Sequence, residues 1–263
     1  REYVISPDTS SYVMSEPGRP VDSVDMSSFY PDTEGSSMVT TESASSPMSE
    51  AAAASEAVEL GCDLLIFDEE YSNPCILRRG FMADSDSLVP VSEMGRAMGN
   101  AGVSVLMVSG DRDAAALADR VIVMRGFRAE VAEVESRESS RTYSRPNARY
   151  PVSKNIVYEK GRKEVSVSSQ GIRTVEIGEY KVNVPVAGLF DTAQTRAVAD
   201  AVMVAKDLMD GSRSMADMCK EAIDIVMAYD PENGGSMHRA RPRPIDLAMV
   251  LNRHPQMLAI QKR

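Results

Sequence analysis

Four consecutive apolar residues followed by three carboxylates constrain the fold of this chain more than any other feature. The run reads Leu64-Leu65-Ile66-Phe67-Asp68-Glu69-Glu70. A short, uninterrupted apolar run predicts a strand that is buried on both faces of a parallel sheet. The carboxylates then lie at the carboxyl edge of that sheet, where ligands bind in open α/β folds. The alternative interpretation is a strand that runs into a solvated acidic turn.

The segments around this strand alternate between helix and strand over residues 46–127. Ser46-Pro47 is typical of a helix start, and Gly61 is expected to end that helix. Such alternation predicts an α/β fold with mostly parallel core strands and helices packed on them. The further helices are expected at 92–100 and 112–119, a second buried strand at 103–108 and a third strand at 121–124.

Three other regions differ from this core in composition and periodicity. The composition of residues 1–45 predicts a Ser/Pro-rich loop and edge strands rather than core. Residues 128–190 are expected to form a basic linker and a β segment. Residues 191–263 are expected to form a helical C-terminal region. The expected strands are 3–5, 21–26, 163–167 and 174–184, and the expected helices are 193–209, 215–229 and 246–251.

Composition and charge exclude several classes of protein. A net charge of −10 and a pI near 4.9 argue against nucleic-acid binding over the whole surface. No apolar run approaches the roughly 20 residues that a bilayer crossing needs, so no membrane partner is expected. Cys62, Cys75 and Cys219 form no C-x-x-C pair, which indicates reduced thiols of an intracellular protein. The first residue is Arg1, so any targeting segment is expected upstream.

Several short motifs, in their order along the chain, resemble those of the predicted ATPases of the ABC class. The matching segments are residues 24–29, 50–60, 68–72, 109–111, 118–126, 171–178, 194–197 and 241–253. The resemblance implies the C-terminal part of an ABC-type P-loop ATPase fold. It also implies ATP or ADP with Mg²⁺ as ligands, and a homodimer.

By this resemblance, Asp68 is the Walker B metal ligand and Glu69 is the catalytic carboxylate that positions the attacking water. Ser109 lies at the switch position, where most ABC ATPases have histidine. A hydroxyl cannot replace an imidazole in that role, so we expect slow turnover or reliance on another group.

Residues 45–50 lie where the resemblance places the ABC signature, with Ser45, Ser46 and Ser49 as nucleotide-binding residues. A helix N-terminus with free N–H groups is a suitable phosphate site. In ABC dimers the signature of one subunit contacts the nucleotide of the other. The family's glycine is replaced by Ser46, and Pro47 removes one N–H donor. The alternative is an ordinary Ser/Pro helix cap.

No G-x-x-x-x-G-K-[ST] motif occurs in the 263 residues. The segment Gly161-Arg162-Lys163 lacks both the spacing and the strand-loop-helix setting of a phosphate loop. We therefore expect the phosphate cradle upstream of Arg1, and residues 1–263 alone not to be a competent ATPase.

Residues 136–163 form a basic island in an acidic chain, with eight cationic side chains against two acidic ones. Arginines interleaved with aromatic rings suit single-stranded RNA, because cations neutralise phosphates and rings stack on bases. The alternative is a solvated linker. The expected RNA-binding residues are Arg137, Arg141, Tyr143, Arg145, Arg149 and Tyr150.

Some members of the family resemble RNA-associated factors, including a trypanosomatid mitochondrial RNA-editing accessory protein. This branch implies a nucleotide cycle coupled to RNA binding, in the mitochondrial matrix. Two alternatives stay open. One is a soluble, cytoplasmic ABC-class ATPase with no nucleic-acid role, and the other is a degenerate ABC fold that binds nucleotide only as a structural ligand.

Overall fold

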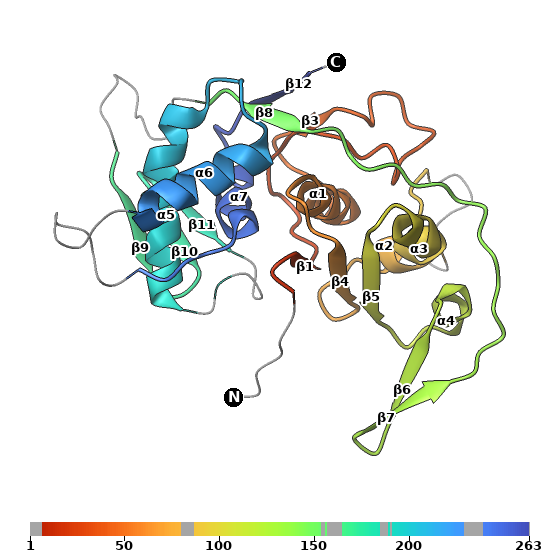
Figure 1. Cartoon of the computed structure of the whole chain (residues 1–263). Helices are drawn as coiled ribbons and strands as arrows, with labels where there is room; N and C mark the ends of the chain where they lie inside the picture. The colour runs from red at the N-terminus through yellow and green to blue at the C-terminus, as the bar shows by residue number, and fades with distance from the viewer. Residues whose placement is uncertain are drawn as a thin grey trace.

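The computed structural model describes residues 7–79, 87–153, 156, 165–184, 189, 191–228 and 239–262. The strand expected at 3–5 lies outside these residues. Part of the basic island does too, namely Lys154, Tyr158, Lys160, Arg162 and Lys163. The described helices and strands form two parts that lie side by side (Figure 1).

A parallel sheet with the strand order β1-β4-β5 forms the centre of the N-terminal part. These strands are Ser10–Val13 (β1), Leu64–Asp68 (β4) and Ser104–Val108 (β5). The predicted strand before the carboxylates is confirmed as β4, and it is the middle strand of the three. Leu65 and Phe67 are fully buried, whereas the alternate residues of β4 are only partly buried.

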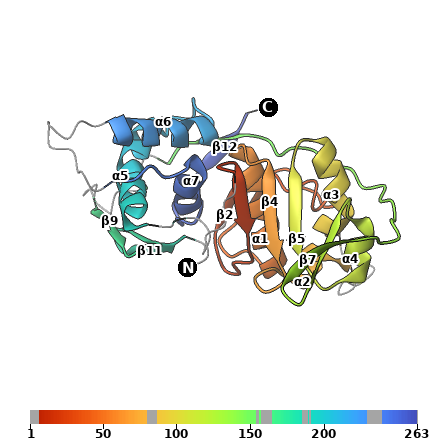
Figure 2. The same cartoon turned by 60° about the horizontal axis from the view of Figure 1, so that its bottom comes forward.

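The three predicted helices around this sheet are confirmed with small changes at their ends, as Ser46–Glu59 (α1), Val91–Asn100 (α3) and Arg112–Leu117 (α4). A short helix that was not predicted, Pro74–Leu77 (α2), follows the turn after β4. Pro47 lies in the first turn of α1, and Gly61 follows its end with a positive φ of 88° that favours glycine. Helix α1 contacts β1, and α3 contacts β5, so helices cover the sheet (Figure 2).

The strands expected at 103–108 and 121–124 form, but the prediction that 103–108 is a buried strand is wrong for one of its faces. Leu106 and Val108 of β5 are 51% and 53% exposed, because alternate side chains point to opposite faces and this face is open, whereas Val105 and Met107 on the other face pack against the core. The outer edge of β5 has no partner strand in the described part of the chain. Strand β6 (Val121–Arg125) pairs antiparallel with β7 (Arg128–Ala132) instead of joining the parallel sheet. Gly126 and Phe127 both have positive φ, which matches the twist of a two-residue hairpin turn.

The first 45 residues contribute more to the core than their composition suggests. Strands β2 (Val21–Val24) and β3 (Val39–Thr41) form an antiparallel pair. Val13, Met26 and Phe29 are buried in the same core as α1 and β4. This segment therefore belongs to the N-terminal part.

Residues 133–148, which we call the strap, run from the β6–β7 hairpin around the outside of α3 and α4 (Figure 1). The Arg137 N–H donates to the carbonyl of Ala116 at 2.7 Å, and the Ser144 N–H donates to the Ser28 hydroxyl at 3.0 Å. The strap is thus fixed to the N-terminal part at several points, and it leads into strand β8 (Arg149–Pro151).

The C-terminal part combines an antiparallel sheet with helices around its own hydrophobic core. Its elements are β9 (Val167–Gln170), β10 (Thr174–Ile177), β11 (Tyr180–Asn183), α5 (Thr192–Leu208), α6 (Met215–Ala228), α7 (Pro244–Asn252) and β12 (Ala259–Gln261). Asp191 caps α5 by accepting from the Ala193 N–H. Because α5 packs on β9, the expected β segment and the helical region form one unit.

The two parts meet through paired strands and buried polar contacts. Strand β12 pairs antiparallel with β8, and the Ala259 N–H donates to the Asp22 carboxylate at 2.6 Å. Arg149 contacts Glu59 at the end of α1 and Asn252 at the end of α7. In the described residues, none of the helices combines the length and the hydrophobicity that a membrane crossing requires.

Candidate functional site

The predicted metal ligand Asp68 and the predicted catalytic carboxylate Glu69 lie where the sequence places them, at the carboxyl end of β4. Asp68 is the last residue of the strand, and its Oδ1 accepts the N–H of Glu70 at 3.0 Å. The N–H groups of Tyr71 and Ser72 donate to the Asp68 carbonyl, which fixes a tight turn. Oδ2 of Asp68 accepts no hydrogen bond from the described residues. A carboxylate oxygen at an open sheet edge is a suitable hard ligand for Mg²⁺.

Glu69 connects the ends of β4 and β5. Its N–H donates to the carbonyl of Val108 at 3.1 Å, and its Oε2 accepts the N–H of Gly110 at 3.0 Å. The expected switch residue Ser109 lies between these two contacts. The structure therefore brings the expected catalytic carboxylate and the expected switch loop together at one edge of the sheet.

The loop that follows Ser109 is held by an ion pair that sequence reasoning missed. Asp111 caps α4 by accepting the Ala114 N–H at 2.7 Å, and its Oδ2 lies 2.6 Å from Nη1 of Arg78. The Ala114 N–H and the Arg78 guanidinium together lower the pKa of Asp111. Arg78 comes directly after α2, so its position depends on the fold and has no local sequence signal.

The three serines expected to bind nucleotide have different environments at the start of α1. Ser45 is the exposed N-cap residue, and its side chain makes no capping hydrogen bond. The Ser46 hydroxyl lies 2.7 Å from the Ser15 hydroxyl and accepts from the Asn73 amide. Ser49 is 0% exposed, donates to the Ser46 carbonyl and accepts from the Glu16 N–H. We therefore leave Ser49 out of the proposed ligand set.

Asn73 and Glu50 attach the turn after β4 to the first turns of α1, and sequence reasoning gave neither a role. The Asn73 N–H donates to Glu50 Oε2 at 2.7 Å, and the Asn73 side chain donates to Ser46. Glu50 is 0% exposed, and burial raises its pKa to about 7. The helix expected to act as a signature is thus bonded to the turn that carries Asp68 and Glu69.

The residues expected to bind RNA do not form one open surface. Arg149 is 1% exposed and pairs with Glu59 at 2.8 Å, so its guanidinium does not face solvent, and the expectation of an RNA contact there is corrected. Tyr143 packs against the N-terminal core, and burial raises its pKa to about 12. The ring of Tyr150 is covered by Lys262, whose Nζ lies 3.9 Å from the ring centroid.

Three strap arginines remain exposed. Arg137 pairs with Asp113, and Arg141 pairs with Glu93, whereas Arg145 donates to the carbonyls of Ala101 and Gly102. Their burial differs sharply from that of Arg149, although the four arginines recur at every fourth position.

Comparison with known families divides the chain in the same place as the structure. Residues 1–161 match a family model described as the P-loop domain of ABC_ATPase, and residues 166–259 match one described as the MRB1590 C-terminal domain. The first match contains the carboxyl-edge site, and the second contains β9 to α7. No curated protein matches the chain.

Proposed function

The chain belongs to the ABC-class P-loop ATPase family, in its MRB1590-related branch, and on this basis we propose that the full-length protein hydrolyses ATP with Mg²⁺ and couples the cycle to RNA binding. One observation carries the ATPase proposal. The Glu69 carboxylate accepts the Gly110 N–H beside Ser109, while Asp68 lies one residue earlier at the same sheet edge.

Each residue of this edge has a separate task in the proposal. Asp68 would hold Mg²⁺ through Oδ2, which accepts no hydrogen bond from the described residues, and Glu69 would orient and deprotonate the attacking water. Bound Mg²⁺ supplies positive charge next to the transferred phosphoryl group. Ser109 lies near that group, but its hydroxyl cannot replace an imidazole, so the proposed turnover is slow or relies on another group. ATP and its product ADP are the ligands.

We propose that the phosphate cradle comes from outside the 263 residues, because they hold no phosphate-loop motif. Two features of β5 support the addition of this missing part along the outer edge of the sheet. One face of β5 carries exposed Leu106 and Val108, and the outer edge of β5 has no partner strand in the described part of the chain. We further propose a homodimer in which exposed Ser45, with Ser46 behind it, faces the nucleotide held by the second subunit.

The strap supplies the proposed contacts to single-stranded RNA. The ion pair of Arg137 with Asp113 is exposed on both sides, and such pairs contribute little stability, so the arginine is free to exchange its partner for a phosphate. Arg141 and Arg145 lie on the same segment, and Tyr150 follows it. The MRB1590 match supports a role in RNA editing and a location in the mitochondrial matrix, with the cytoplasm as the alternative.

Measuring ATP turnover by the purified full-length protein, with and without Mg²⁺ and single-stranded RNA, tests this function. We expect Mg²⁺-dependent hydrolysis whose rate changes when RNA is added. A hydrolysis rate that does not change when RNA is added would favour an ATPase with no nucleic-acid role. Tight ATP binding with no turnover at all would favour a fold that uses nucleotide structurally.

A further inference from the structure

We propose that Glu16 and Arg253 are positioning residues, which let the C-terminal part set the geometry of the nucleotide site. Glu16 belongs to one short segment, residues 14–19, which we call the junction loop, and Arg253 contacts this segment from the end of α7. The loop connects β1 to β2 and contacts the start of α1, the turn after β4, and the end of α7. The inference rests on the proposed nucleotide site, but its structural part can be tested without nucleotide.

The junction loop holds the start of α1 through three of its residues. The Ser15 hydroxyl contacts the hydroxyl and the carbonyl of Ser46, and the Glu16 N–H donates to the Ser49 hydroxyl at 2.9 Å. Arg19 donates to the Ser49 carbonyl at 3.1 Å and forms a bidentate ion pair with the carboxylate of Glu56. All of these contacts lie on the helix whose N-terminus is the proposed signature.

The same loop also holds the turn that carries the catalytic carboxylates. The Ser15 N–H donates to the carbonyl of Tyr71 at 2.9 Å. Tyr71 is itself bonded through its N–H to the carbonyl of Asp68, and its ring lies edge-on to Tyr12 of β1. A shift of the junction loop therefore moves both the proposed signature and the turn after Asp68 and Glu69.

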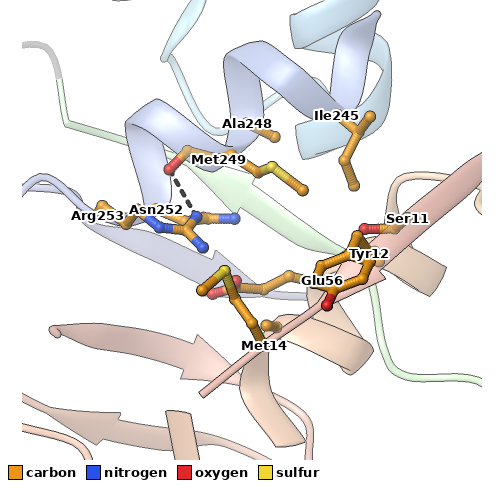
Figure 3. A pocket seen from close by; sticks show the side chains of 11 residues that line it. Ser11, Tyr12, Met14, Glu56, Ile245, Ala248, Met249, Asn252 and Arg253 are labelled. Carbon is orange, nitrogen blue, oxygen red and sulfur yellow. Dashed lines mark hydrogen bonds between the residues drawn. The ribbon is translucent and has the colours of Figure 1, made fainter. Parts of the chain in front are cut away.

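From the C-terminal part, Arg253 clamps this loop. Its Nε and Nη2 donate to the two carboxylate oxygens of Glu16 at 2.7 and 2.9 Å. Its Nη1 donates to the carbonyl of Met249, which fixes the guanidinium against the end of α7 (Figure 3). The cavity that remains between α7, β1 and α1 at this point has a volume of only about 10 Å³, so the two parts are closely packed here (Figure 3).

Burial makes this clamp more than a surface ion pair. The Arg253 side chain is 9% exposed and that of Glu16 is 19% exposed. A planar guanidinium that meets both oxygens of a carboxylate fixes orientation as well as distance. One residue, Glu16, thus contacts α7 through its side chain and α1 through its backbone, so any movement of α7 is passed to the site directly.

The test uses the full-length protein and compares Glu16→Gln with Glu221→Gln. The control breaks a more exposed ion pair of the same distance, 2.7 Å, between Glu221 and Arg213, that lies within the C-terminal part and away from the junction loop. The single variant leaves the charge of Arg253 without its partner, which can prevent folding. If it does not fold, the double variant Glu16→Gln, Arg253→Gln is used instead, because it removes both charges of the ion pair. Backbone amide exchange is measured without nucleotide, and kcat and KM for ATP are measured alongside it.

In Glu16→Gln, we expect faster exchange of the backbone amides of residues 14–19 and of residues 69–75. In the control variant, we expect the exchange of both segments to stay at the wild-type rate. We also expect kcat to fall by about tenfold with KM for ATP almost unchanged, since a misplaced site loses rate more than ground-state binding. Unchanged exchange in residues 69–75, an unchanged kcat, or equal effects in the control would overturn the proposal. If the wild type hydrolyses no ATP, the proposed function fails, and the exchange result alone then decides whether the clamp positions the turn.

Discussion

The N–H of Gly110 donates a 3.0 Å hydrogen bond to the carboxylate of Glu69, and this bond joins two strand ends that lie 41 residues apart in the sequence. A side chain at position 110 would come near the other oxygen of Glu69, since an added Cβ lies 3.8 Å from Oε1. A backbone N–H, with no side-chain donor among the described residues, therefore holds the carboxylate at the sheet edge. This orientation leaves its remaining lone pairs for a water molecule.

Glu69→Gln in the full-length protein should abolish most ATP turnover and leave ATP binding nearly intact. The amide oxygen of Gln can still accept the Gly110 N–H, so the loop stays in place while the base is lost. We expect a fall in kcat of roughly 10²–10⁴-fold, the usual contribution of a general base. Steady-state hydrolysis and equilibrium ATP binding measure the two effects separately.

Glu70→Gln is the matched control for that variant, because Glu70 is the next carboxylate along the chain and is exposed. It should keep turnover within about twofold of wild type, as expected for a surface substitution away from the chemistry. Equal turnover in wild type and Glu69→Gln would show that the carboxylate does not act as a base.

Asp68→Asn should weaken Mg²⁺-dependent nucleotide binding instead. The neutral amide keeps an oxygen but loses the charge that a hard divalent cation prefers. We expect ATP affinity in Mg²⁺ to drop by on the order of tenfold, while affinity in a chelator changes little. Titration of ATP in both buffers measures the difference. An equal loss in both buffers would indicate that Asp68 supports the fold and not the ion.

The core of this site could be predicted from the sequence because its signals are local. Four apolar residues before Asp68 specify a strand, of which Leu65 and Phe67 are buried, and Ser46-Pro47 and Gly61 mark the ends of α1, although the N-cap is Ser45 and not Ser46. These features depend on a few adjacent residues, so they need no knowledge of the tertiary fold.

The contacts that hold the site could not be predicted, because they join residues far apart in the chain. Glu16 meets Arg253 across 237 positions, and Arg149 meets Glu59 across 90. Nothing in the regular spacing of the strap arginines separates buried Arg149 from exposed Arg145. Only the pairing of β8 with β12 does so, because it places Arg149 between the two parts.

Residues 1–263 expressed alone should show no saturable ATPase activity, because they contain no phosphate-loop motif. The expected result is a linear, enzyme-independent background of phosphate release across the ATP range. A measurable KM for ATP with this piece would mean that the phosphates are held by residues inside it, and the proposed division of the site would be wrong.

Glu50 should make stability depend on pH between its ordinary pKa of 4.5 and its raised pKa of about 7 in the folded chain. Between these values the unfolded chain loses the proton while the folded chain keeps it. Stability from this group is therefore present at low pH and is lost as pH rises towards 7. Each pKa unit is worth about 1.4 kcal/mol, so the total effect is at most about 3 kcal/mol.

Urea unfolding of Glu50→Gln and wild type from pH 5 to 8 measures this effect. The variant is neutral throughout, so its stability relative to wild type should increase up to about pH 7 and then stay constant. Glu42→Gln, which changes an exposed carboxylate, should run parallel to wild type over the whole range. A constant difference between Glu50→Gln and wild type would show that Glu50 ionises normally in the folded protein.

Replacing Arg137, Arg141 and Arg145 with Ser should reduce the salt dependence of RNA binding. Each neutralised phosphate of a single strand contributes about −0.7 to the log–log slope of affinity against salt, so the slope should flatten by up to about two units. The loss should be similar for different RNA sequences, because phosphate contacts do not read bases. Fluorescence anisotropy with a short single-stranded RNA at several salt concentrations gives both quantities.

The control for this triple variant removes three exposed arginines elsewhere, namely Arg120, Arg125 and Arg128 around the β6–β7 hairpin. Both variants make the chain more acidic by the same charge, so a general repulsion of RNA would affect them equally. A specific strap site predicts a flatter slope only for the strap variant. Because the chain carries a net charge of −10, binding without a localised basic site is unfavourable. If both variants bind RNA with the wild-type slope, the strap arginines serve only to hold residues 133–148 on α3 and α4, and any affinity for RNA comes from another surface.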